Sequence, residues 1–175
     1  MKQDEKGFTL LELIITIAIM VLVSGAALAG IFQISKTTEL NANYMTAVFQ
    51  VQNAGYWIAH DTRMAQGLTT DNLTLPDFLI LSWIEQGSCD KYQLTYTLEN
   101  MAGSQLTKML RNQYINGVLI TTTLVAQYID PDNGNTRCEY DSGILYLNIT
   151  ATVDRGSCVE IETRSYNIVP RPNSY

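Results

Sequence analysis

An almost unbroken apolar run over residues 8–32 constrains this chain more than any other feature. At about 1.5 Å per helical residue the run is about 37 Å long, enough to cross a bilayer. Glu12 is its only ionisable residue. A lone carboxylate in a membrane-length apolar segment costs several kcal/mol unless it has a partner, so Glu12 is a candidate functional residue. Cleavage between Gly7 and Phe8 would create an α-amine able to act as that partner.

A short polar leader, residues 1–6, precedes this run, and the order Lys6-Gly7-Phe8-Thr9-Leu10-Leu11-Glu12 joins the two. The arrangement resembles the prepilin signal of type IV pilins and of the pseudopilins of type II secretion and competence systems. The resemblance implies that a membrane peptidase cuts after Gly7 and that Phe8 is then N-methylated. It also implies that Glu12 pairs with the N-terminal amine of a neighbouring subunit during filament assembly. The implied partners are prepilin peptidase, other pilins or pseudopilins, the inner-membrane assembly machinery and membrane lipid.

Two other interpretations of the N-terminus stay open. The apolar run would also serve as an ordinary uncleaved single-pass anchor. Alternatively, Ala27-Leu28-Ala29 has the small-residue form of a signal-peptide cleavage site, and cutting there would release a soluble domain. Either alternative would make the protein an extracytoplasmic binding or adhesion module, and neither explains Glu12.

The composition argues against direct nucleic-acid binding. The chain has 17 acidic and 11 basic side chains, a net charge of −6 and a pI near 4.6. An acidic surface repels phosphates, and no cluster of Lys or Arg offsets it. Without the leader and the anchor, about 140 residues remain, which is the usual size of one domain.

The three cysteines, Cys89, Cys138 and Cys158, are odd in number. An exported domain lies in a compartment that tolerates disulfides, so one internal pair is possible, and its partners are undetermined by spacing. The absence of C-x-x-C spacing and the single histidine, His60, argue against a zinc site.

The apolar run continues into an amphipathic pattern. Apolar or small residues recur at steps of three and four, and no proline precedes Pro76, so we expect one helix over about residues 8–64. The expected inner face comprises Leu40, Tyr44, Val48, Val51, Gly55, Ile58 and Thr62. Gly55 would allow close approach of a sheet.

The remainder is rich in strand formers. Residues 66–77 are typical of a loop, and residues 78–84 of a buried strand. Residues 92–98 alternate as a half-buried strand does, and residues 106–114 form its expected hairpin partner. Residues 118–129 are compatible with strand or helix. Residues 145–153 and 158–168 are two further strands joined by a turn at 154–157.

The expected fold is therefore α+β: a long N-terminal helix, membrane-spanning in its first half, packed on an antiparallel sheet, as in pilin-like subunits. The expected organisation is a leader (1–7), a transmembrane or filament-core helix (8–32) and an extracytoplasmic domain (33–175), helical to about residue 65. Three features are similar to J-type minor pseudopilins: residues 57–61, the 92–98 strand followed by Leu110-Arg111, and the closing residues 169–173.

No enzymatic motif is present, and His60 is interpreted as a solvated or packed helix residue. Asp130, Asp132 and the more distant Asp141 surround a Pro/Asn/Gly-rich stretch and are calcium candidates, although a surface turn is favoured there. The sequence thus predicts a subunit, minor rather than major, of a type IV pilus or type II secretion pseudopilus. It would be a single-pass membrane protein that moves into a cell-surface or periplasmic filament, with no cofactor.

Overall fold

The computed structural model describes residues 9–71, 73–85, 87, 89–155 and 158–171. The chain divides into two compact units, Met1–Asn41 and Ala42–Tyr175. Helix α1 (Leu10–Met64) supplies the described part of the first unit and continues into the second. Its N-terminal region is long and apolar enough to cross a membrane. The assignment of residues 33–175 to the extracytoplasmic side stays a prediction.

Within the second unit, one face of α1 is buried. Its buried residues are Asn43, Ala47, Val51, Ala54, Gly55, Ile58, Asp61 and Thr62. The expected inner face is confirmed at Val51, Gly55, Ile58 and Thr62. It is wrong at Tyr44, which is exposed. Asn43 takes the inner position instead, because its amide donates to the main-chain oxygens of Arg155 and Cys158.

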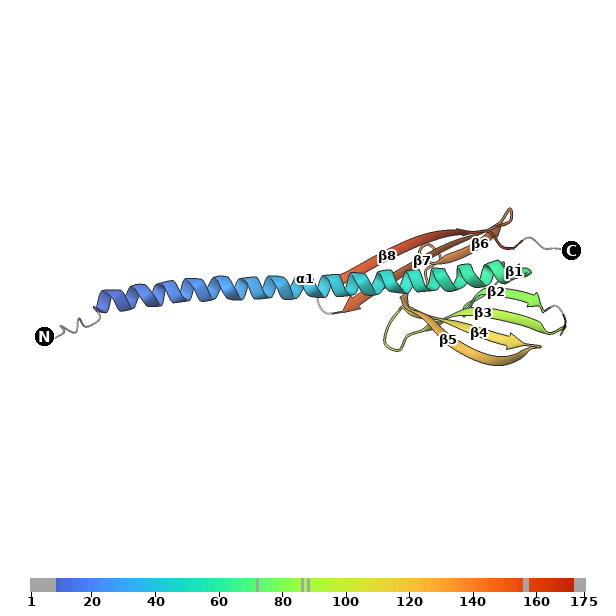
Figure 1. Cartoon of the computed structure of the whole chain (residues 1–175), viewed down its shortest axis with the longest axis horizontal. Coiled ribbons are helices and arrows are strands. Elements are labelled where there is room, and N and C mark those ends of the chain that lie inside the picture. The colour runs from blue at the N-terminus through green and yellow to red at the C-terminus, as the bar shows by residue number, and fades with distance from the viewer. Residues whose placement is uncertain (1–8, 72, 86, 88, 156–157, 172–175) are drawn as a thin grey trace. The chain divides into compact units, whose positions relative to one another are not determined.

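Eight strands, formed by the described residues, follow the helix (Figure 1). They are β1 (Gly67–Thr69), β2 (Asp77–Ile84), β3 (Lys91–Asn100), β4 (Thr107–Ile115), β5 (Val118–Ile129), β6 (Arg137–Asp141), β7 (Ile144–Arg155) and β8 (Cys158–Ile168). All pairings are antiparallel, and the sheet order is β1-β2-β3-β4-β5-β7-β6, with β8 on β7. The expected helix followed by an antiparallel sheet is confirmed.

Most expected strands are present, with four differences. Residues 67–69 are not loop but a short strand paired with β2. Residues 118–129 are strand throughout, because β4 pairs along their length. Residues 94–98 are buried on both faces rather than half-buried. Strand β6 was not predicted. A turn was expected at residues 154–157, and residues 156 and 157 lie outside the described residues.

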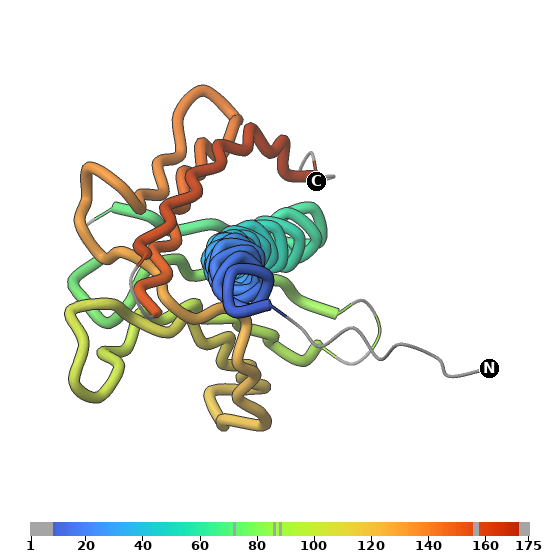
Figure 2. The backbone as a smooth tube through the Cα atoms, turned by 90° about the vertical axis from the view of Figure 1, so that its left-hand side faces the viewer, coloured from blue at the N-terminus to red at the C-terminus, as the bar shows by residue number. Residues whose placement is uncertain are grey.

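The sheet curls around the C-terminal part of α1 (Figure 2). It is nearly interrupted between β5 and β7, because these two strands pair only at Ile129 and Ala151. We call β1–β5 the first lobe and β6–β8 the second lobe. The two lobes flank the C-terminal part of α1 in Figure 1. Helix α1 contacts both: the Asn53 amide donates to the Val125 carbonyl of β5 (2.6 Å), and the Tyr166 hydroxyl of β8 donates to the Val51 carbonyl (3.1 Å).

Gly55 is a position at which the second lobe approaches α1 closely. A Cβ atom at this position would overlap the ring of Tyr166. The expectation that Gly55 permits close approach of a sheet is therefore confirmed. Gly25 and Gly30 have no atom within 4 Å of the corresponding Cβ position.

Candidate functional site

Glu12 is engaged locally at the start of α1. The main-chain N–H and the hydroxyl of Thr9 each donate to its Oε2, both at 2.9 Å, and the Glu12 N–H donates to Thr9 Oγ1 at 3.3 Å. These reciprocal bonds form a capping box, which satisfies donors that the first helical turn leaves free. Gly7 and Phe8, the expected cleavage and methylation residues, lie outside the described residues.

The capping box gives Glu12 a partner within its own chain. The carboxylate lies at the positive end of the helix dipole and is followed by exposed apolar side chains, such as Leu13, Ile14 and Ile17. Both of its hydrogen-bond partners belong to Thr9, so the capping box itself places no cationic group beside the carboxylate. Its local contacts explain helix capping, and its setting in an apolar segment is unexplained by capping alone.

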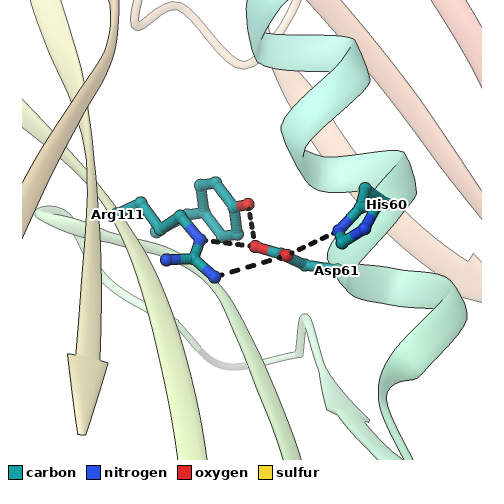
Figure 3. A network of polar contacts seen from close by, with 4 residues as sticks. His60, Asp61 and Arg111 are labelled. Carbon is teal, nitrogen blue, oxygen red and sulfur yellow. Dashed lines mark hydrogen bonds and ion pairs between the residues drawn. The ribbon is translucent and has the colours of Figure 1, made fainter.

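A second polar site lies in the core of the body (Figure 3). The side chain of Asp61 on α1 is only 1% exposed. Its Oδ2 accepts from Arg111 Nε of β4 at 2.6 Å and from the Tyr96 hydroxyl of β3 at 2.5 Å. Its Oδ1 lies 3.4 Å from Arg111 Nη2 and 3.2 Å from His60 Nδ1. The guanidinium also stacks over the Trp57 ring, at 5.2 Å from its centroid.

The electrostatics of this cluster follow from its burial. Burial, and then the neighbouring Asp61 carboxylate, raise the pKa of Tyr96 far above its ordinary value. Burial acts to lower the pKa of Arg111, but the hydrogen bond and charge of Asp61 outweigh it, so the net shift is upward. The cluster is thus a charge-paired anchor that joins α1 to β3 and β4.

Sequence reasoning missed this anchor, although one signal was present. Asp61 lies three residues after Ile58 on the predicted inner face, where an acidic residue requires a partner. His60 has a side chain that is 51% exposed, in agreement with a packed or solvated helix residue. Two of the three features noted for their similarity to J-type pseudopilins, residues 57–61 and the 92–98 strand followed by Leu110-Arg111, supply Asp61, Tyr96 and Arg111 to this cluster.

Comparison with known families bears on the N-terminal site. Residues 2–28 match the family model described as the prokaryotic N-terminal methylation motif. This is the prepilin-type signal of type IV pilins and pseudopilins. The match does not extend into the body of this pilin-like chain, and so it does not confirm the J-type assignment. Neither the search of curated proteins nor that of solved structures gave a match.

The calcium candidates of this pilin-like chain are not gathered in one place. Asp130 accepts from the Asp132 N–H and the Asn135 amide, and Asp132 accepts from the Gly134 N–H at 2.8 Å, so both carboxylates stabilise the turn. Asp141 closes β6 at the opposite end from this turn. Among the described residues, no group of three acidic, histidine or cysteine side chains could hold a metal ion.

Cys138 lies too far from Cys158 and from Cys89 to pair with either. Cys138 opposes Leu147 and Cys158 opposes Arg155 on the same strand, β7, which separates them by about 26 Å at 3.3 Å per residue. A disulfide requires Cα atoms within about 7 Å. Cys89 lies beyond the Ile84 end of β2, whereas Cys138 lines a depression with Asp77 at the other end of that strand. Burial, and then Glu139, raise the pKa of the Cys138 thiol to about 12.

Proposed function

We propose that this chain is a minor subunit of a type IV pilus or type II secretion pseudopilus and acts by filament assembly. The prepilin-type motif and the α+β fold support a pilin-like subunit. The absence of a proline within residues 8–32 favours a minor subunit, because many major pilins carry one there. The body would lie outside the cytoplasm while the apolar part of α1 remains in the membrane.

Assembly would proceed in three steps. Prepilin peptidase cuts between Gly7 and Phe8, and Phe8 is N-methylated. The apolar part of α1 then leaves the bilayer and packs among the helices of related subunits. There the Glu12 carboxylate exchanges the Thr9 hydrogen bonds for the Phe8 amine of a neighbour. Because an unpaired buried charge is costly, this pairing would fix the register between subunits.

The main support for the proposal is the Glu12 carboxylate, which lies within an apolar helix that matches the N-terminal methylation motif. A pair of variants separates its two roles. Glu12→Gln keeps the capping box, since glutamine serves at this position, but removes the charge. Glu12→Ala removes both.

We expect both variants to insert into the membrane and to be cleaved, and both to be lost from sheared filaments, as measured by immunoblotting of the membrane and filament fractions. Thr9→Ala is the matched control, because it removes the side-chain half of the cap and leaves the charge. Normal incorporation of Glu12→Gln would show that capping alone explains Glu12.

Processing is tested separately by N-terminal sequencing of the mature protein. We expect a start at N-methylated Phe8, and Gly7→Glu should leave the leader attached, visible as a slower band on a gel. A start at Met1 would indicate an uncleaved anchor, and a start just after Ala29 would indicate a released module. Either start contradicts the proposed function.

A further inference from the structure

Tyr128 has an unusual main-chain conformation for a bulky residue. It lies near the end of β5, one residue before Ile129, and its φ angle is 61°. In this left-handed region the Cβ atom of an L-residue crowds the main chain, so a large side chain is an outlier there. The other non-glycine residues described with a positive φ, Cys89, Asn116 and Ser142, lie between strands, whereas Tyr128 lies within one. Such an outlier persists only where its surroundings hold it in place.

Hydrogen bonds on either side of Tyr128 fix the main chain around it. The Gln127 N–H donates to Gln50 Oε1 of α1 at 2.7 Å, and the Ile129 carbonyl accepts from the Thr107 hydroxyl of β4 at 3.0 Å. The register of β4 and β5 shifts here, and β5 carries one extra residue. Tyr128 therefore lies in a β-bulge, which bends a strand and changes the direction of its side chains.

Tyr128 also directly precedes the junction between the two lobes. We use this term for the pairing of Ile129 with Ala151 of β7 and for the hydrogen bond from the Asp130 N–H to the Thr150 carbonyl, at 3.0 Å. Rotation about φ of one residue moves the chain that follows it. Relaxation of Tyr128 to the negative φ of an ordinary strand would therefore carry Ile129 and Asp130 away from β7.

The side chain of Tyr128 contacts Arg155, the last residue of β7. The guanidinium donates a hydrogen bond to the Tyr128 hydroxyl, and its central carbon lies 4.9 Å from the centroid of the ring. A cation in this position is attracted to the aromatic ring. Arg155 is held in turn by α1, because the Asn43 amide donates to its main-chain oxygen at 3.0 Å. The contact thus stabilises the conformation in which the Tyr128 ring reaches the second lobe.

We propose that Tyr128 and Arg155 form a strained latch that keeps the sheet closed between its two lobes. The contact with Arg155 offsets the energetic cost of the left-handed main chain at Tyr128. When the contact is lost, Tyr128 relaxes, and β5 parts locally from β7. The junction is then the part of the body that opens first, while the strand pairing within each lobe is kept. The latch lies wholly within the body and does not require filament assembly.

Hydrogen exchange of the full chain in detergent, followed by mass spectrometry, tests the latch. Arg155→Met should speed exchange at the junction, in the peptide over residues 125–131, on the order of tenfold, and should leave residues 109–113 of β4 unchanged. Arg137→Met is the matched control, because it removes an exposed arginine of the second lobe that pairs with Glu139 at 3.9 Å. It should not change exchange at the junction. Unchanged exchange at the junction in Arg155→Met would overturn the proposal.

Two substitutions of Tyr128 separate backbone strain from the simple loss of a contact. Glycine adopts a positive φ about as readily as a negative one, whereas alanine is strained there and, like glycine, lacks the ring. In the Arg155→Met background, Tyr128→Gly should return exchange at the junction close to the wild-type rate, and Tyr128→Ala should leave it fast. Equal exchange in these two double variants would show that strain plays no part and that the latch is wrong. None of these measurements depends on filament incorporation, so that result would leave the proposed function standing.

Discussion

Asp61 shows how one charged residue can fix a helix against a sheet. Its carboxylate is enclosed by groups from three elements and accepts hydrogen bonds from both Arg111 and Tyr96. A buried ion pair of this kind adds little to the free energy of unfolding compared with well-packed apolar residues. Removal of one partner, however, leaves the other charge buried and unpaired. The role of the cluster is therefore to specify the position of α1 on β3 and β4.

Arg111→Met should lower the free energy of unfolding by about 3–5 kcal/mol, because it leaves the Asp61 carboxylate buried and unpaired. Urea unfolding of the full chain in detergent, followed by circular dichroism, measures the change. Lys108→Met is the matched control on the same strand: it breaks an exposed pair with Glu99 and should cost less than about 1 kcal/mol. Equal losses in the two variants would contradict the anchoring role.

At the scale of elements, the contact between α1 and β8 depends on a missing side chain. The ring of Tyr166 occupies the space where a Cβ of residue 55 would lie. Glycine costs helix stability, by up to about 1 kcal/mol relative to alanine. Its presence here is explained by the closeness of the strand, whereas no described residue outside the adjoining turns of α1 lies within 4 Å of the Cβ position of Gly30.

Gly55→Ala should destabilise the body by about 1–3 kcal/mol through overpacking, despite the better helix propensity of alanine. The same unfolding measurement applies, with Gly30→Ala as a control that should be neutral or slightly stabilising. In a Tyr166→Ala background, Gly55→Ala should lose most of its cost, because the ring is gone. An unchanged cost in that background would show that the ring is not the cause.

Local patterns predicted the elements better than the contacts between them. The alternation around Tyr92 and the apolar run before Trp83 predicted strands because these signals lie within a few residues of sequence. Strand β6 was missed because its five residues carry mostly charged and polar side chains. The Asp61 anchor joins residues up to 50 positions apart, and no local period reports such a contact. Glu12 is identified by sequence because it is the only ionisable residue in the apolar run over residues 8–32.

For the whole molecule, the main structural fact is that α1 connects two lobes that scarcely pair with each other. The Asp61 cluster holds the first lobe, and Tyr166 and Asn43 hold the second. The ionisation of Tyr96 therefore bears on the stability of the body as a unit. In the folded state its hydroxyl keeps its proton, because burial and the Asp61 carboxylate raise its pKa.

Alkaline conditions should consequently favour unfolding. The unfolded chain releases the Tyr96 proton near its ordinary pKa of about 10, whereas the folded chain retains it, so the stabilising contribution is complete below about pH 10 and is lost as the pH rises further. Urea midpoints measured from about pH 8 to 11 should fall, and Tyr96→Phe should show a shallower decline. Identical slopes for the two proteins would contradict this assignment.

Strand β8 covers the C-terminal part of α1, and this order has a consequence for biogenesis. Val51 and Gly55 receive Tyr166 from a segment synthesised more than a hundred residues later. A nascent chain that lacks β8 has an α1 helix whose surface at Val51 and Gly55 is not yet covered by Tyr166. Strand β8 must therefore be synthesised before the body can mature, and the earlier strands cannot complete it alone.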